Sequence, residues 1–217
     1  MRGRTPLRSA LLLGLAVALA GCAPSRAILT GPEGEQAERF FARLPEGASF
    51  PVKASFSGIA HLPGRDAMPF IAGLNASAPS AETLGLYDPM GGAAAFLAND
   101  GRVLKLSRGP VADLAGNWQP GMMPAEALSL GRILSGAPAY PVSGGEAARG
   151  GDGAWVLTDE RQTLYSDPGR RFLAKAVYRI NGVKATVEYP DRHSADPPAR
   201  IEAAVRGMKI SLRRDPE

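Results

Sequence analysis

Residues 171–190, RFLAKAVYRINGVKATVEYP, decide the fold, because two alternating runs flank the dipeptide Asn181-Gly182. Asn-Gly is the preferred centre of a type I′ turn, which joins two antiparallel strands through two residues. Apolar side chains recur at every second position, at Ala176, Tyr178 and Ile180 before the turn and at Val183, Ala185 and Val187 after it. A period of two places them on one face of each strand. The stretch therefore predicts an antiparallel hairpin with an apolar face.

Similar runs on both sides of this hairpin predict further strands. Arg206-Gly207 separates Ile201, Ala203 and Val205 from Met208, Ile210 and Leu212, which predicts a second tight hairpin. Asn99-Asp100-Gly101 marks a third. The remaining strands are expected near residues 50–62, 69–76, 83–88, 92–98, 102–107, 154–158 and 161–166. About eleven short strands joined by tight turns favour an antiparallel meander.

Two amphipathic helices are expected beside the strands. Residues 35–44 carry Ala37, Phe40, Phe41 and Leu44 at helical spacing behind Pro32. A second helix is expected over residues 124–135, with Pro124 in its first turn and an end at Gly136 and Pro138. The sequence thus predicts one α+β domain, because one face of an antiparallel sheet has to be covered and two or three helices can cover it. A sheet that curls around them could enclose an apolar cavity.

The N-terminal residues have the features of a bacterial signal peptide. Arg2, Arg4 and Arg8 precede the apolar run LLLGLAVALA at residues 11–20, which is too short to cross a bilayer. The run ends in Leu19-Ala20-Gly21-Cys22, the pattern of a lipobox. We therefore expect cleavage after Gly21 and acylation of Cys22. The alternative is an ordinary secretory signal followed by an unrelated cysteine.

Cys22 is the single cysteine of the chain, which favours lipidation and excludes an intrachain disulfide. Stable anchoring needs at least two acyl chains, which a triacylated cysteine supplies. In lipoproteins that this N-terminus resembles, a residue other than Asp after the cysteine directs sorting to the outer membrane, and Ala23 stands there. The expected organisation is a signal peptide at 1–21, a lipidated tether at 22–34 and a domain at 35–217.

Four stretches behind this lipobox carry a resemblance to a known family. They are LGLYDPMGG at 84–92, YRING at 178–182 with VEY at 187–189, PARIE at 198–202 with KISLR at 209–213, and ILSGAP at 133–138. In this order and spacing, over about residues 50–213, they resemble the LolB family of outer-membrane lipoprotein receptors. One position departs from the family pattern: Ala185 stands where the family has a tryptophan. The cavity lining could differ in volume as a result, which leaves the cargo open.

The resemblance implies an open half-barrel of about eleven strands around an apolar cavity, capped by helices. It implies a monomer without a cofactor that accepts the acyl chains of lipoproteins from a LolA-like periplasmic carrier. The chain would face the periplasm and help insert its cargo in the outer membrane. The turn Pro89-Met90-Gly91 would contact outer-membrane lipid, because Met90 replaces an exposed leucine with this role in the family. The alternative is that Met90 folds back onto the core, as methionines usually do.

Other function classes find little support in the sequence. Loss of Arg2, Arg4 and Arg8 would lower the formal charge from +4 to about +1, so nucleic-acid binding is not expected. His61 and His193 are isolated, and neither a metal-ligand spacing nor a G-x-S-x-G motif occurs, so we expect no metal and no enzyme. Two alternatives stay open: a lipoprotein that binds other hydrophobic ligands on the same scaffold, and a scaffolding subunit of an envelope complex with a filled core.

Overall fold

The computed structural model describes residues 26–44, 50–79, 81–108, 121–124, 128–180, 182–194 and 196–216. Eleven strands lie where the sequence predicts them: β2 (Val52–His61), β3 (Met68–Ala78), β4 (Ala81–Tyr87), β5 (Ala93–Asn99), β6 (Val103–Arg108), β9 (Trp155–Thr158), β10 (Gln162–Ser166), β11 (Leu173–Ile180), β12 (Val183–Glu188), β13 (Arg200–Val205) and β14 (Met208–Arg214). Three short strands were not predicted: β1 (Ala27–Ile28), β7 (Gly121–Pro124) and β8 (Glu146–Arg149). Each is two to four residues long and sits in a Pro- or Gly-rich stretch, where periodicity is too short to detect.

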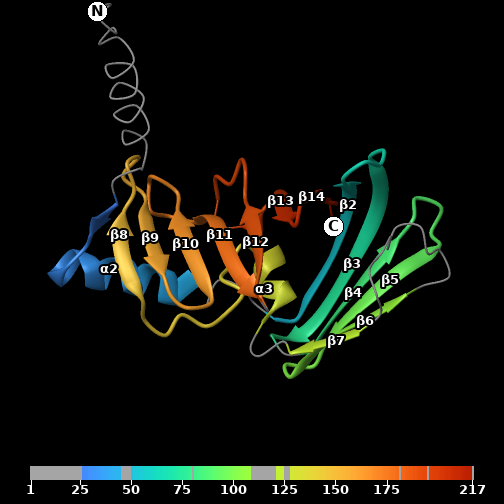
Figure 1. Cartoon of the computed structure of the whole chain (residues 1–217), viewed down its shortest axis with the longest axis horizontal. Coiled ribbons are helices and arrows are strands. Elements are labelled where there is room, and N and C mark those ends of the chain that lie inside the picture. The colour runs from blue at the N-terminus through green and yellow to red at the C-terminus, as the bar shows by residue number, and fades with distance from the viewer. Residues whose placement is uncertain are drawn as a thin grey trace, which may run out of the picture.

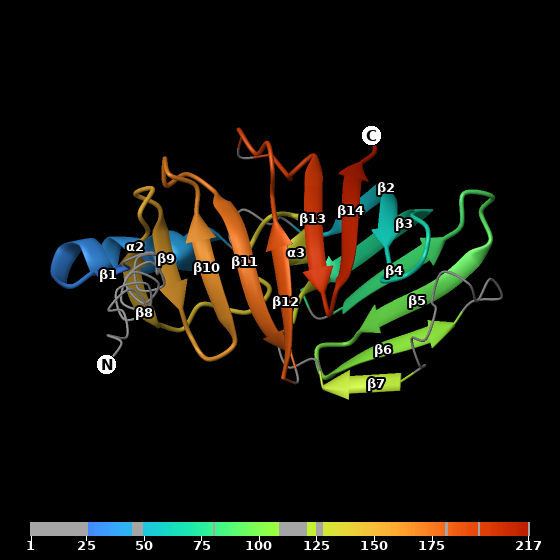
Figure 2. The same ribbon diagram turned by 45° about the horizontal axis from the view of Figure 1, so that its top comes forward.

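All fourteen described strands form one sheet, in the order β1-β8-β9-β10-β11-β12-β13-β14-β2-β3-β4-β5-β6-β7. The sheet is antiparallel throughout, and β1 and β7 lie at its two open ends. It bends strongly between β14 and β4, so that β2 to β7 turn away from the other half (Figures 1 and 2). The predicted fold class, an α+β open half-barrel, is confirmed, with three strands more than expected.

The two halves of the sheet meet at one pair of strands that are distant in sequence. The chain builds β2 to β7 outward in one direction, crosses over, and returns from β8 to β14. β14 then pairs with β2 from Lys209 opposite His61 to Arg214 opposite Phe56. The Asp215 carboxylate closes this seam, because it accepts hydrogen bonds from Ser55 Oγ at 2.7 Å and Ser57 Oγ at 2.9 Å.

The tight hairpins have the turn geometry that the sequence predicts. Val205 pairs with Met208, and the two residues between them have φ of 47° at Arg206 and 81° at Gly207. Two positive φ values are what a type I′ turn requires. Ile180 likewise pairs with Val183 around the Asn-Gly turn, of which Asn181 lies outside the described residues.

Helix α2 (Gly31–Arg43) packs against β8 and β9. It begins four residues earlier than expected, since Pro32 and Glu33 form its first turn, where a proline and an acidic side chain are both favourable. Glu33 pairs with Arg149 of β8, and the hydrogen bond from Arg149 lowers the pKa of Glu33. β1 and this first turn fall within residues 22–34, where the sequence suggests only a tether.

Helix α3 (Leu130–Leu134) is much shorter than the predicted helix over 124–135. The prediction of its start was wrong, because Pro124 belongs to β7 and pairs with Val103 of β6. Ser129 is the N-cap, and its Oγ accepts a hydrogen bond from Arg132 N at 3.1 Å. No helix in the described part of the chain is long and apolar enough to cross a membrane.

The core lies on the inner face of the curved sheet. Cross-strand pairing connects one row of apolar residues over eight strands: Ala147, Leu157, Leu164, Ala176, Val187, Ala203, Ile210 and Ala60. Directly paired residues share a face, so the row defines the inner surface. Among the described residues, every member of the hydrophobic core is Leu29 or a later residue, so the chain from residue 26 onward contains the described fold.

Candidate functional site

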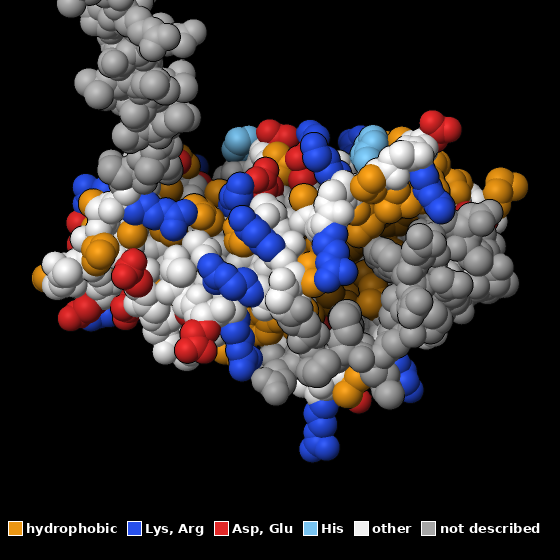
Figure 3. All heavy atoms as spheres, viewed as in Figure 1, with side chains coloured by type: hydrophobic (Ala, Val, Ile, Leu, Met, Phe, Trp, Pro, Cys, Tyr) orange, Lys and Arg blue, Asp and Glu red, His pale blue; other side chains and the backbone are white. Residues whose placement is uncertain are grey.

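The inner face is not filled evenly along the sheet. On β8 to β10 its apolar side chains are buried, whereas on β4, β5 and β11 to β14 several are only partly buried: Leu84, Leu86, Leu97, Ile180, Ala185, Ala203, Ile210 and Leu212. Figure 3 shows a hollow with a hydrophobic floor beside β2 to β4. This set of half-exposed residues is called the inner apolar surface below. The described part of the chain leaves this inner apolar surface partly accessible.

Backbone packing keeps this surface smooth at Gly58 on β2. A Cβ there would lie 2.5 Å from Phe70 Cζ and 2.9 Å from Leu212 Cδ2. Both distances are too short for real atoms, so a larger residue at this position would push the ends of these two side chains off the strand. Ala185, the position of the family's tryptophan, lies opposite Tyr178 and Val205 on the same face and is half-buried. A small residue at this position leaves the surface open.

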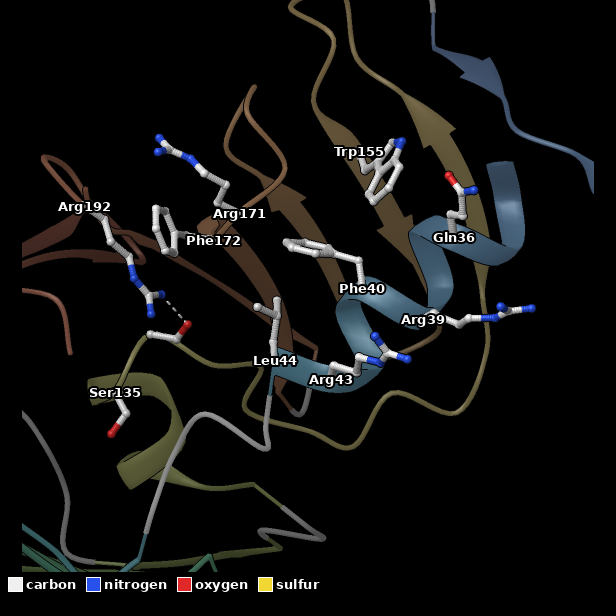
Figure 4. Close-up of a pocket in the computed structure, with 11 residues that line it drawn as sticks. Gln36, Arg39, Phe40, Arg43, Leu44, Ser135, Trp155, Arg171, Phe172 and Arg192 are labelled. Carbon is white, nitrogen blue, oxygen red and sulfur yellow. Dashed lines mark hydrogen bonds between the residues drawn. The ribbon is translucent and has the colours of Figure 1, made fainter. Parts of the chain in front are cut away.

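A separate groove lies between the C-terminal end of α2 and the loops at the ends of β11 and β12 (Figure 4). Its volume is about 600 Å³. The apolar lining includes Phe40 and Leu44 of α2, Trp155 of β9 and Phe172 beside β11. The Phe40 and Trp155 rings meet edge to face with centroids 5.7 Å apart, which fixes this wall of the groove.

Four arginines also line this groove, which is called the arginine groove below. Arg39 and Arg171 are neutralised locally, by Glu35 at 2.7 Å and by Asp167 at 3.5 Å. No described carboxylate lies within 4.0 Å of the other two, Arg43 and Arg192. The groove therefore carries net positive charge.

Arg192 is held in place from two sides. Its Nη1 donates a hydrogen bond to the Gly136 carbonyl at 2.6 Å, and its guanidinium lies 5.4 Å from the centre of the Phe172 ring. Gly136 has φ of +75°, and a Cβ there would lie 2.2 Å from Arg192 Nη1, so this contact requires glycine. Burial lowers the pKa of Arg192, although an arginine stays charged at neutral pH.

The turn between β4 and β5 presents Met90 to the outside. The Asp88 Oδ1 atom accepts hydrogen bonds from Met90 N at 2.9 Å and Gly92 N at 2.7 Å, and Gly91 has φ of +86°. Met90 is 93% exposed, so the alternative of a side chain folded onto the core is wrong. Pro89 and Gly91 occupy the turn as the sequence suggests. Contact of this turn with a membrane stays a prediction.

The other predicted site residues fall in different places. Gly21 and Cys22 lie outside the described residues. His61 ends β2 and His193 is in the loop before β13. The described residues contain no cluster of three His, Cys, Asp or Glu side chains placed to hold a metal ion.

The sequence analysis missed the arginine groove. Arg39 and Arg43 recur four residues apart, each one residue before an apolar position that the helix prediction uses, Phe40 and Leu44. This spacing places basic side chains along the edge of the helix's apolar face, a signal that could have been recognised. Arg192 joins them only through the fold, because it is about 150 residues away.

Comparisons with known proteins find similar structures but no similar sequences. No protein-family model matches the chain, and no curated protein matches it in sequence. A LolA superfamily protein from Nitrosomonas europaea aligns at 11% identity with a TM-score of 0.49, over 84% of this chain and 91% of its own. A putative outer membrane lipoprotein-sorting protein domain from Vibrio parahaemolyticus aligns at 9% identity with a TM-score of 0.44, over 84% of this chain and 91% of its own. A DUF1329 family protein from Desulfovibrio piger aligns at 9% identity with a TM-score of 0.47, over 86% of this chain and 92% of its own. Because all three scores are below 0.5, a function for this chain has to rest on its own residues.

Proposed function

We propose that this chain is an envelope lipoprotein that binds acyl chains of incoming lipoproteins and passes them to the outer membrane. The observation that carries the proposal is the inner apolar surface, whose half-exposed aliphatic side chains line an open half-barrel. Acylation of Cys22 would hold the domain at the membrane on its periplasmic side. A LolA-like periplasmic carrier would supply the cargo.

Such a transfer needs only a gradient of affinity. Each buried methylene contributes about 0.8 kcal/mol wherever the acyl chain is bound. The domain therefore has to hold the chains more tightly than the carrier and less tightly than the bilayer. A half-exposed surface suits an intermediate affinity, since the ligand keeps one side uncovered. The proposed function includes no covalent step, so we propose that the protein is not an enzyme.

Met90 is proposed to bring the domain to the lipid. Burial of one such side chain contributes roughly 1.5–3 kcal/mol, which is too little to anchor a protein but enough to orient a turn. The hydrogen bonds from Met90 N and Gly92 N to Asp88 keep the turn in shape without using the Met90 side chain. This leaves the thioether free to enter a lipid surface.

A transfer assay tests the proposal. The chain from Ala23 onward, which contains the whole described fold, receives an acylated lipoprotein from a purified periplasmic carrier and is then mixed with liposomes. We expect the wild type to take up and deliver the cargo, and Met90→Glu to take it up but deliver at least about tenfold less, since burying an unpaired charge in lipid is costly. Ile28→Glu is the matched control, because Ile28 is also an exposed apolar residue, on β1 at the far end of the sheet.

The two steps of the assay fail separately. If no cargo leaves the carrier, the proposed receptor function is contradicted. If Met90→Glu delivers as well as Ile28→Glu, uptake by the inner apolar surface stands and the role of Met90 does not.

A further inference from the structure

We infer that the arginine groove binds the anionic head group of an acyl lipid, with part of the lipid's chain on Phe40, Leu44 and Phe172. The inference rests on the proposed function in one respect, that apolar surfaces of this domain take acyl chains. It adds the chemical class of a ligand. The acylated cysteine of a lipoprotein carries no anion on its lipid, so the groove fits an anionic lipid better than that cargo.

Charge is the first argument. Arg43 on α2 and Arg192 after β12 line the groove from two different elements, and no described acidic residue lines it. The carbonyl end of α2 adds only about half a negative charge, against two full positive charges. Guanidinium groups bind carboxylate and phosphate oxygens through paired hydrogen bonds, so the groove selects an anion of this kind.

The second argument is the way in which the Arg192 guanidinium is held. One of its donors is used by the Gly136 carbonyl, whereas its buried Nε has no hydrogen-bond partner among the described residues. The ring of Phe172 and the Gly136 contact keep the guanidinium from turning toward solvent. The Nε itself is enclosed and is not the point of contact, but Arg192 as a whole is only half-buried and lines the groove, so the rest of this held guanidinium can meet an acceptor that comes from outside the chain.

The apolar lining is the third argument, because it distinguishes a lipid from a free anion. Phe40, Leu44 and Phe172 are only half-buried and face the same space as the arginines (Figure 4). The volume of about 600 Å³ falls within the range of sites that enclose small organic ligands. Inorganic phosphate would leave this lining exposed, and a neutral glyceride would leave the arginines unused. An anionic acyl lipid uses both.

Calorimetric titration of the chain from Ala23 onward tests the inference. The ligands are a lysophospholipid with a single negative charge, a fatty acid and a monoacylglycerol of the same chain length, all below their micelle concentrations, and inorganic phosphate. We expect the two anionic lipids to bind at least about tenfold tighter than the monoacylglycerol. The arms also show whether phosphate or carboxylate is preferred. Inorganic phosphate is expected to bind far more weakly than either lipid.

Substitutions connect the preference to the two arginines. Arg43→Gln should lower the preference for anionic lipids several-fold, Arg43→Lys should retain most of it, and Arg43→Gln with Arg192→Gln should abolish it. Arg43 is exposed, and none of the hydrogen bonds or ion pairs among the described residues involves its side chain, so its variants are expected to fold normally. Arg102→Gln is the matched control, because Arg102 is an exposed arginine in the β5–β6 turn.

Two results would overturn the inference in different ways. Equal affinity for the anionic and neutral lipids, or a preference that survives loss of both arginines, contradicts the head-group site and leaves acyl binding intact. Failure of every acyl compound to bind contradicts the proposed function as well.

Discussion

The two halves of the sheet differ in how their inner faces are covered. In the half that α2 covers, Leu157 and Leu164 are 1% and 0% exposed, and Phe41 of the helix is fully buried in the same hydrophobic core. In the half formed by β2 to β7, Leu84 and Leu97 pair across β4 and β5 and remain half-exposed. Figure 1 shows α2 under β8 to β10 and no described helix under β5 to β7. A single amphipathic helix thus closes the core of one half, whereas the described residues leave apolar side chains of the other half only partly covered.

The largest expected effect comes from comparing a substitution in the half that α2 covers with one in the open half. Phe41→Ala should lower the free energy of unfolding by about 3–5 kcal/mol, because it empties a buried site. Leu84→Ala should cost less, about 1–2 kcal/mol, since this side chain is only partly buried. Urea denaturation followed by circular dichroism measures both. Equal losses would show that the two halves are covered alike.

A second prediction concerns the connection between α3 and the open half. The Glu82 carboxylate of β4 is 2% exposed and accepts four hydrogen bonds, from Asn99 Nδ2 at 3.0 Å, Ser129 Oγ at 2.5 Å, Leu130 N at 2.7 Å and Gly131 N at 2.9 Å. It therefore holds the start of α3 over the inner face of β4.

Removing this carboxylate should destabilise the protein because it leaves buried donors unpaired. Glu82→Ala is expected to lower the free energy of unfolding by about 3 kcal/mol. Glu38→Ala, on the exposed side of α2, is the control and should change it by less than about 0.5 kcal/mol. Hydrogen exchange should also show faster opening of residues 130–134 in Glu82→Ala. Unchanged exchange at residues 130–134 would show that the Glu82 hydrogen bonds do not hold α3 in place.

The smallest effect is expected at the seam where the halves join. Hydrogen bonds from Ser55 and Ser57 lower the pKa of Asp215. A carboxyl group with a lowered folded-state pKa stabilises the protein above its unfolded pKa of about 3.9, and this contribution is lost as pH falls through the folded value. The contribution is therefore fully present at neutral pH and declines below about pH 4.

Asp215→Asn should consequently reduce stability slightly at pH 7 and make it less dependent on pH between about 4 and 2. Thermal unfolding at a series of pH values measures this slope. Asp66→Asn provides the control, since Asp66 is exposed in the turn after β2. If the stability of Asp215→Asn depends on pH as steeply as that of the wild type, Asp215 does not contribute to the loss of stability in acid.

The sequence by itself determined what depends on neighbouring residues. Strands follow from a period of two, and hairpins follow from dipeptides that tolerate positive φ, as Arg206-Gly207 does. The exposed Met90 also follows from local chemistry, because Asp88, Pro89 and Gly91 shape a tight turn around it. These features need only the few residues that make them.

The tertiary structure alone decided what depends on residues distant in sequence. Periodicity cannot show that β14 pairs with β2, or that β8 is a strand because β1 and β9 flank it. Periodicity also predicted too long a second helix, because Pro124 of β7 pairs with Val103 of β6 and this pairing competes with the helix that the local sequence favours. The arginine groove has the same origin. Arg43 and Arg192 lie about 150 residues apart, and only the curvature of the sheet around α2 brings them to the lining of one groove.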